Sequence, residues 1–228
     1  MNLGLVSKTA INKIFWAVLI TAMLFISAIV NVYASDSLTE DEKKLISQGE
    51  VVVREVSIDN QQGKTFEAIG LINAPGETIL KVLTAYEKYP EFMSNISRVD
   101  IVKKSGTDVV LNYTLSLPLG KMKKYRLKIS MTEPNNQISV LKWQLQKWPG
   151  LDPRETIKDT TGYWRIEKKT EKSSLVFYHV YTDPGPIPFG LEWIVDVLSK
   201  KSVPEAFLQT KARTEKIALN IGTNNKSE

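Results

Sequence analysis

Few residues in this chain could carry covalent or acid–base chemistry. Cysteine is absent, and His179 is the only histidine among 228 residues. A Cys-His nucleophile is therefore excluded, and a Ser-His-Asp site would have one candidate base. His179 lies in a strand-like stretch and shares an alternating face with Phe177 and Tyr181. This position predicts either a packing residue or a polar contact to a ligand headgroup, and no catalytic residue is predicted.

Neither a metal nor a cofactor is expected. No His/Cys cluster has the spacing of metal ligands, and no glycine-rich phosphate loop is present. The carboxylates of Asp152, Glu155 and Asp159 lie in a loop rich in Pro, Gly and Asp, where solvation explains them.

Aromatic residues are the more informative group. The segment 86–96 reads Tyr-Glu-Lys-Tyr-Pro-Glu-Phe-Met-Ser-Asn-Ile and suits the rim of an apolar cavity. Large aromatic side chains mostly fill cores, while ligand pockets combine apolar side chains with a few polar groups. The candidate ligand-binding residues are Tyr89, Phe92, Met93, Tyr113, Arg126, Trp143, Trp164, His179, Tyr181 and Trp193. The pattern leaves open which face of each strand lines the cavity.

Charge gives weaker indications. A net charge of +5 without a clustered patch is no nucleic-acid footprint, so no nucleic-acid partner is expected. Alternation places Lys124, Arg126 and Lys128 on one strand face. That face is either a solvated outer surface or a docking patch for anionic lipid headgroups. We expect a monomer, and the second interpretation of this face predicts transient contact with a membrane.

Apolar spacing predicts the elements that position these residues. A short polar helix is expected at 39–48, followed by strands at 51–58 and 64–72 that form a hairpin. Pro75 suits the first turn of the next helix, which leads into segment 86–96. Five or six antiparallel strands follow, because apolar and polar residues alternate between turn signals.

The chain ends in helical patterns. One amphipathic series covers 191–198, and a second predicts a helix over 203–221, about 28 Å long, enough to cross a sheet. Its expected apolar stripe consists of Phe207, Leu208, Ala212, Ile217 and Ile221. We therefore predict an α+β fold, a curved antiparallel sheet wrapped around a long C-terminal helix with a cavity between them.

Residues 1–34 differ from the rest. Lys8 and Lys13 precede an apolar run, and Val32 and Ala34 occupy the −3 and −1 positions of a small-residue cleavage site. This is typical of a secretory signal peptide, and an uncleaved anchor at 14–34 is the alternative. Without cysteine, an exported chain fits a bacterial periplasm or secretion, and a lipoprotein anchor is excluded.

The mature chain divides further by composition. The expected parts are a helical lead-in at 35–49, one domain at 50–221 and a tail at 222–228.

The chain resembles the START-like superfamily, in its polyketide cyclase/dehydrase and lipid-transport branch, which includes coenzyme Q-binding proteins. The resemblance is carried by the stretch from Ile72 to Leu83, by Tyr86 to Met93, by Gly162 to Ile166, by Tyr178 to Pro188 and by the terminal helix. Ala85 and Ser94 depart from the family pattern, which often has an acidic residue and a proline there. The resemblance implies the helix-grip fold for the predicted sheet and helix, and it implies binding of a lipid, quinone, sterol or polyketide.

Three functional hypotheses follow. The first is sequestration or transport of a lipid, quinone or isoprenoid in the cavity. The second is a cyclase or dehydrase-like enzyme acting on a polyketide-type substrate, for which the acid–base groups are sparse. The third is an interaction module with a filled core. Segment 86–96 and the loop at 184–190 are the expected entrance to any cavity.

Overall fold

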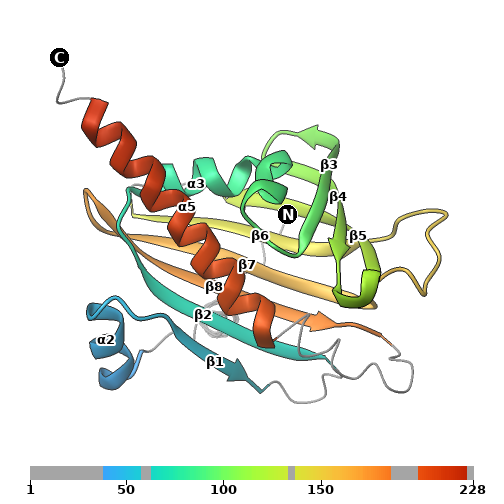
Figure 1. Cartoon of the computed structure of the whole chain (residues 1–228), viewed down its shortest axis with the longest axis horizontal. Helices are drawn as coiled ribbons and strands as arrows, with labels where there is room; N and C mark the ends of the chain where they lie inside the picture. Colours follow the sequence, from blue (N-terminus) through green and yellow to red (C-terminus); the bar gives the residue numbers. More distant parts are fainter. Residues whose placement is uncertain (1–37, 58–62, 133–136, 186–199, 225–228) are drawn as a thin grey trace, which may run out of the picture. The chain divides into compact units, whose positions relative to one another are not determined.

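The computed structural model describes residues 38–57, 63–132, 137–185 and 200–224 (Figure 1). Eight antiparallel strands form one sheet in the order β1-β2-β8-β7-β6-β5-β4-β3. The strands are β1 Val52–Val56, β2 Lys64–Ile72, β3 Ile96–Ser105, β4 Asp108–Ser116, β5 Met122–Thr132, β6 Ile138–Gln146, β7 Asp159–Thr170 and β8 Ser173–Asp183. All of them belong to the second of two units into which the chain separates, Lys44–Glu228.

The helices follow the predicted order. They are α2 Glu40–Ser47, α3 Gly76–Thr84, the short 3-10 helices η2 Tyr86–Glu91 and η3 Pro118–Gly120, and α5 Ser202–Asn224. A capping box starts α2, because the Glu42 N–H donates to Thr39 Oγ1 at 3.2 Å and the Thr39 N–H donates to the Glu42 carboxylate at 2.8 Å. Pro75 directly precedes α3. The predicted helix at 191–198 lies outside the described residues.

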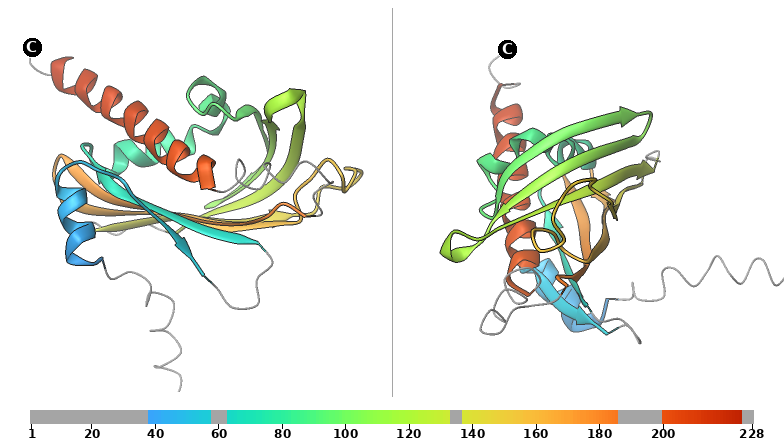
Figure 2. Two further views of the ribbon diagram at one scale, coloured as in Figure 1. Left: turned by 60° about the horizontal axis from the view of Figure 1, so that its bottom comes forward. Right: turned by 90° about the vertical axis from the view of Figure 1, so that its right-hand side faces the viewer.

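The sheet curves around α5, so its two faces differ (Figure 2). We call the face toward α5 the inner face and the opposite one the outer face. On β4, Leu111, Tyr113 and Leu115 are buried on the inner face, as their alternation predicts. β2 is instead buried at most positions on both faces. The predicted helix-grip architecture is confirmed.

α5 packs on β2, β8 and α3. Val203, Phe207, Thr210 and Thr214 form its buried side, with at most 2% of each residue exposed. A Cβ at Gly70 would lie 3.0 Å from the Phe207 ring, so glycine there permits the close approach of helix and strand.

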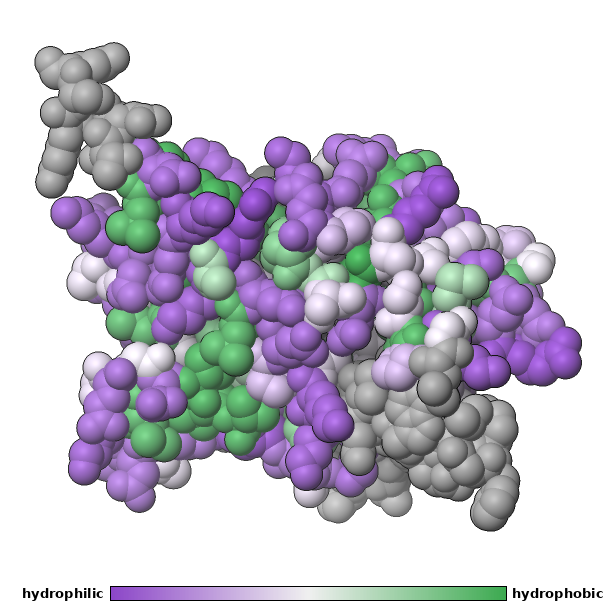
Figure 3. All heavy atoms as spheres, viewed as in Figure 1, coloured by the Kyte–Doolittle hydropathy of each residue, from purple (hydrophilic) through white to green (hydrophobic). Residues whose placement is uncertain are grey.

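The predicted stripe on α5 was partly wrong. Leu208 is 50% exposed and Ile221 is 48% exposed, while Phe207 is fully buried. The side of α5 that contacts the sheet consists of residues 203, 207, 210 and 214. Successive side chains on an α-helix are rotated by about 100°, so Leu208 points away from the side on which Phe207 is buried. Figure 3 shows the side of the molecule on which α5 lies, where groups of hydrophobic residues are exposed among hydrophilic ones. Within the described residues, no helix is both long and apolar enough to cross a membrane.

Candidate functional site

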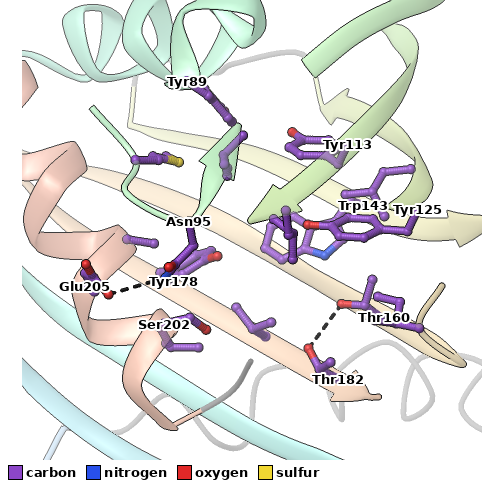
Figure 4. A pocket seen from close by; sticks show the side chains of 18 of the residues that line it. Tyr89, Asn95, Tyr113, Tyr125, Trp143, Thr160, Tyr178, Thr182, Ser202 and Glu205 are labelled. Atoms are coloured by element: carbon purple, nitrogen blue, oxygen red, sulfur yellow. Dashed lines mark hydrogen bonds between the residues drawn. The ribbon is translucent and has the colours of Figure 1, made fainter. Parts of the chain in front are cut away.

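A cavity lies between the inner face of the sheet, the η2–β3 segment and the first turns of α5 (Figure 4). Its volume is about 160 Å³. Its lining is mostly apolar and aromatic, and comprises Tyr89, Met93, Asn95, Ile96, Tyr113, Leu115, Leu117, Tyr125, Leu127, Ile129, Leu141, Trp143, Ile157, Thr160, Trp164, Tyr178, Val180, Thr182, Ser202, Val203, Glu205, Ala206 and Gln209. Such a composition matches the general character of small-molecule pockets.

Aromatic side chains stack along the cavity wall. Tyr113 and Tyr125 are neighbours across β4 and β5, with ring centroids 5.3 Å apart and planes inclined by 5°. Trp164 and Tyr178 pair across β7 and β8 at 3.8 Å and 16°. In both pairs the rings are nearly parallel, in the offset-stacked arrangement that aromatic side chains favour.

Gly162 makes room for Trp143 in this wall. A Cβ at Gly162 would overlap the carbonyl oxygen of His179 and the indole of Trp143. Trp143 and Gly162 are cross-strand partners on β6 and β7, so the indole lies over the position that a side chain would otherwise fill.

The cavity tyrosines stay neutral at physiological pH. Burial raises the pKa of Tyr89, Tyr113, Tyr125 and Tyr178 above the ordinary tyrosine value. The Tyr89 hydroxyl donates to the Leu83 carbonyl oxygen at 2.6 Å. Within the described part of the chain, the other three hydroxyls make no hydrogen bond. They are therefore available as donors to a bound molecule.

Polar side chains close the cavity on the α5 side. The Glu205 carboxylate accepts hydrogen bonds from the Ser94 hydroxyl, from Gln209 Nε2 at 3.2 Å and from Asn95 Nδ2 at 3.5 Å. Gln209 Nε2 also donates to the Ser94 hydroxyl at 3.0 Å. We call Ser94, Asn95, Glu205 and Gln209 the Glu205 network. It joins α5 to the start of β3.

One turn further along α5, Arg213 strengthens the same junction. Its guanidinium lies 2.8 Å from the Glu91 carboxylate and 5.8 Å from the Phe92 ring centroid. Segment 86–96 is thus held against α5 by side chains at i, i+4 and i+8 of one helix face.

Five of the ten residues predicted as ligand contacts line the cavity: Tyr89, Met93, Tyr113, Trp143 and Trp164. Phe92 packs edge-on against Tyr89 and does not line the cavity. Trp193 lies outside the described residues.

The three remaining candidates, Arg126, His179 and Tyr181, lie on the outer face. Each neighbours a cavity residue in sequence, Tyr125, Tyr178 or Val180, and successive strand side chains point to opposite faces. The structure therefore does not bring these three together with the cavity residues.

On the outer face, His179 belongs to a buried ionic cluster. Glu67, with a side chain 1% exposed, is bound by Arg54 at 2.8 Å, and His179 Nδ1 lies 3.4 Å from its carboxylate. The Tyr163 hydroxyl donates to Glu67 at 3.4 Å, and the Tyr163 ring stacks on His179 at 5.0 Å. Burial raises the pKa of Glu67, but the adjacent His179 and Arg54 side chains outweigh it and leave a lowered pKa.

The basic strand face is largely paired. Lys128 lies 2.6 Å from Asp108, Lys124 lies 3.6 Å from Glu155, and Arg126 Nε donates to Asn112 at 2.8 Å. These pairs favour the interpretation of a solvated outer surface over that of a headgroup patch. Among the described residues, no group of three His, Cys, Asp or Glu side chains is placed to hold a metal ion.

Sequence reasoning missed Tyr125 and Tyr178 as cavity residues, and it also missed Asn95, Glu205 and Gln209 of the Glu205 network. Tyr125 was recognisable from the alternation that included Tyr113, because both lie on the apolar side of their strands. The Glu205 network joins residues separated by 110 positions or more, and nothing local indicates that contact.

Comparison with solved structures supports the fold. The STAR-related lipid transfer protein of Xanthomonas axonopodis superposes with a TM-score of 0.60 at 13% identity, over 72% of this chain and 93% of the other. Human StAR-related lipid transfer protein 5 superposes with a TM-score of 0.63 at 11% identity, over 92% of this chain and 99% of the other. The Zhui aromatase/cyclase of Streptomyces sp. R1128 superposes with a TM-score of 0.56 at 11% identity, over 72% of this chain and 95% of the other.

At these identities the likeness concerns the fold alone. No curated protein matches the chain by sequence. A family model does match: polyketide cyclase / dehydrase and lipid transport, over residues 72–193. That span begins at the last residue of β2 and includes α3, η2 and strands β3 to β8, which supply most of the cavity wall. The chain therefore belongs to the polyketide cyclase/dehydrase and lipid transport family.

Proposed function

We propose that this protein binds a hydrophobic molecule, a lipid, quinone or isoprenoid, in the cavity between the sheet and α5, and sequesters or transports it. The observation that carries the proposal is the 160 Å³ cavity with its stacked aromatic wall. A ligand that enters the cavity is stabilised there, because burial of its apolar area drives its transfer from water.

The lining favours binding over catalysis of the cyclase or dehydrase type. Glu205 is the only carboxylate among the described lining residues, and they include no histidine. The four tyrosines have raised pKa values and are poor general bases near pH 7. A cyclase would need a base placed against its substrate.

Filling the cavity tests the proposal. Ala206 lines the cavity from α5, while Leu208 is half exposed on the same helix. Ala206→Phe should place a ring in the void and lower the amount of co-purifying ligand about tenfold, equivalent to about 1.4 kcal/mol. Leu208→Phe should retain wild-type loading. Both proteins would be expressed as complete chains and measured by native mass spectrometry and organic extraction. Wild-type protein that carries no hydrophobic molecule and takes up no offered lipid or quinone would refute the proposal.

We further propose that residues 1–34 direct export to the periplasm or outside the cell, with cleavage after Ala34. The support is the sequence pattern of residues 1–34, a basic start, an apolar run and a small-residue site. Intact mass and N-terminal sequencing of protein from periplasmic and membrane fractions test this. A mature chain that begins at Ser35 is expected. Full-length protein retained in the membrane would instead support an anchor at 14–34.

A further inference from the structure

We propose that the ligand of this cavity has an uncharged polar end, a hydroxyl or carbonyl group, and that anionic lipids such as fatty acids and phospholipids are excluded. This inference rests on the proposed function and concerns the chemical class of the ligand.

The first argument is the sign of the charge in the lining. The 23 described lining residues include no Lys, Arg or His, and their only carboxylic acid is Glu205. Three internal segments lie outside the described residues, at 58–62, 133–136 and 186–199, and none of them contains Lys, Arg or His. An anionic headgroup drawn into this cavity would lose its water and find a carboxylate rather than a cation. Burial of an unpaired charge costs several kcal/mol or forces the group to become neutral.

The second argument is the kind of hydrogen-bonding group that the cavity offers. The hydroxyls of Tyr113, Tyr125 and Tyr178 make no hydrogen bond within the described part of the chain. The Thr160 hydroxyl donates to the Tyr181 carbonyl oxygen at 2.7 Å, and Thr182 Oγ1 lies 3.4 Å from Thr160 Oγ1 (Figure 4). Neutral O–H groups are suited to neutral oxygen atoms, which they can satisfy without any charge to balance.

Lys123, a cation on the inner face, is already engaged in hydrogen bonds. Lys123 pairs with Leu115 across β4 and β5, at the end of the cavity wall. Its ammonium donates to the carbonyl oxygens of Arg154 at 3.0 Å and Thr156 at 2.8 Å. Burial also lowers the pKa of Lys123. Two of its three N–H groups are thus used to hold the loop that precedes β7, rather than to face the cavity.

A series of probes with one chain length and different headgroups tests the inference. Hexadecan-1-ol, hexadecanoate and hexadecyl phosphate would each be titrated into delipidated protein at pH 8, with quenching of Trp143 and Trp164 fluorescence as the readout. The alcohol should bind at least about tenfold more tightly than either anion, equivalent to about 1.4 kcal/mol. The affinity for hexadecanoate should rise as the pH falls toward its own pKa, by up to about tenfold per unit, because only the neutral acid enters.

Charge variants separate headgroup selection from general electrostatics. Glu205→Gln should raise the affinity for hexadecanoate several-fold at pH 8, because it removes the one anionic group of the lining. Glu215→Gln makes the same change on α5 outside the cavity, where Glu215 accepts a hydrogen bond from Asn73, and should leave the alcohol-to-carboxylate ratio unchanged.

The outcomes are distinguishable. Hexadecanoate or hexadecyl phosphate binding as tightly as the alcohol at pH 8 would overturn the inference, as would carboxylate binding that Lys123→Met abolishes. Either result would leave the proposed function standing. Failure of all three probes, together with an absence of co-purified ligand, would instead overturn the proposed function itself.

Discussion

The two faces of strands β7 and β8 carry opposite chemistry within the same backbone. On the inner face, Trp164 and Tyr178 stack beside an open cavity that lacks any described cation. On the outer face, Tyr163 and His179 stack beside a buried carboxylate whose charge Arg54 balances. The aromatic pairs are similar, but one borders a void and the other borders an ion pair.

This difference shows how strand alternation can reserve one face for a ligand. A buried charge requires close-packed partners that fix its geometry, which leaves no room for a guest. A neutral aromatic wall tolerates an unfilled volume at a bounded cost in stability. The outer face therefore stabilises the sheet, while the inner face gives up stability for space.

The largest expected effect comes from breaking the outer cluster. Arg54→Met should leave the Glu67 carboxylate buried with a lost partner and lower the free energy of unfolding by about 3 kcal/mol. Arg98→Met is the matched control, because the Arg98–Asp100 pair is solvent-exposed and should be worth less than about 1 kcal/mol. Urea unfolding followed by circular dichroism measures both. Equal losses of unfolding free energy in the two variants would mean that the buried Arg54–Glu67 pair stabilises the protein no more than an exposed ion pair does.

A smaller loss of unfolding free energy is expected when a side chain is added to the cavity wall on the inner face. Gly162→Ala introduces a Cβ that overlaps backbone and the Trp143 indole, and should cost about 2 kcal/mol and reduce ligand loading. Gly76→Ala supplies the comparison. Its added Cβ would come no closer than 3.4 Å to Ile166, so that variant should unfold at or slightly above the wild-type denaturant concentration. Wild-type ligand loading in Gly162→Ala would show that Trp143 is not needed in the wall.

The stability of the folded protein should depend on pH through the Glu67 carboxylate of the outer face. The pKa of Glu67 is lowered in the folded protein, so its contribution is complete above the unfolded value and is lost as the pH falls through the folded value. Between about pH 5 and 3, wild-type stability should therefore fall more steeply than that of Glu67→Gln. Parallel slopes in thermal melts across this range would show that another carboxylate controls acid unfolding.

The smallest expected effect concerns ligand binding. Arg126 lies on the outer face, where it bonds Asn112 and lies 5.3 Å from the Trp148 ring centroid. Arg126→Gln should therefore change the affinity for a cavity ligand by no more than about twofold, within the range of ordinary surface substitutions. A large loss of affinity on titration would place Arg126 in contact with the ligand and break the distinction between the faces.

Much of the architecture was predictable from the sequence because turns and alternation are local signals. The hairpin of β1 and β2 and the run of strands after η2 appeared where their patterns indicated. The choice of face was not predictable, since β2 is buried on both sides and gives no amphipathic signal. Trp164 lines the cavity and Arg165 does not because of cross-strand pairing and the position of α5, both of which are long-range properties.

The pairing of β2 with β8 has a consequence for how the chain is made. Ile72 of β2 pairs with Ser174 of β8 and Lys64 pairs with Thr182, so the paired residues lie more than 100 positions apart in sequence. At about 5–20 residues per second, a ribosome needs about 5–20 seconds to supply β8 after β2 has emerged. During that interval β2 presents an unpaired edge, and its buried positions on both faces are still uncovered, which favours misassociation. Newly made protein should therefore depend on holding chaperones, and refolding should be slow, since non-local pairing must precede the closure of the sheet over α5.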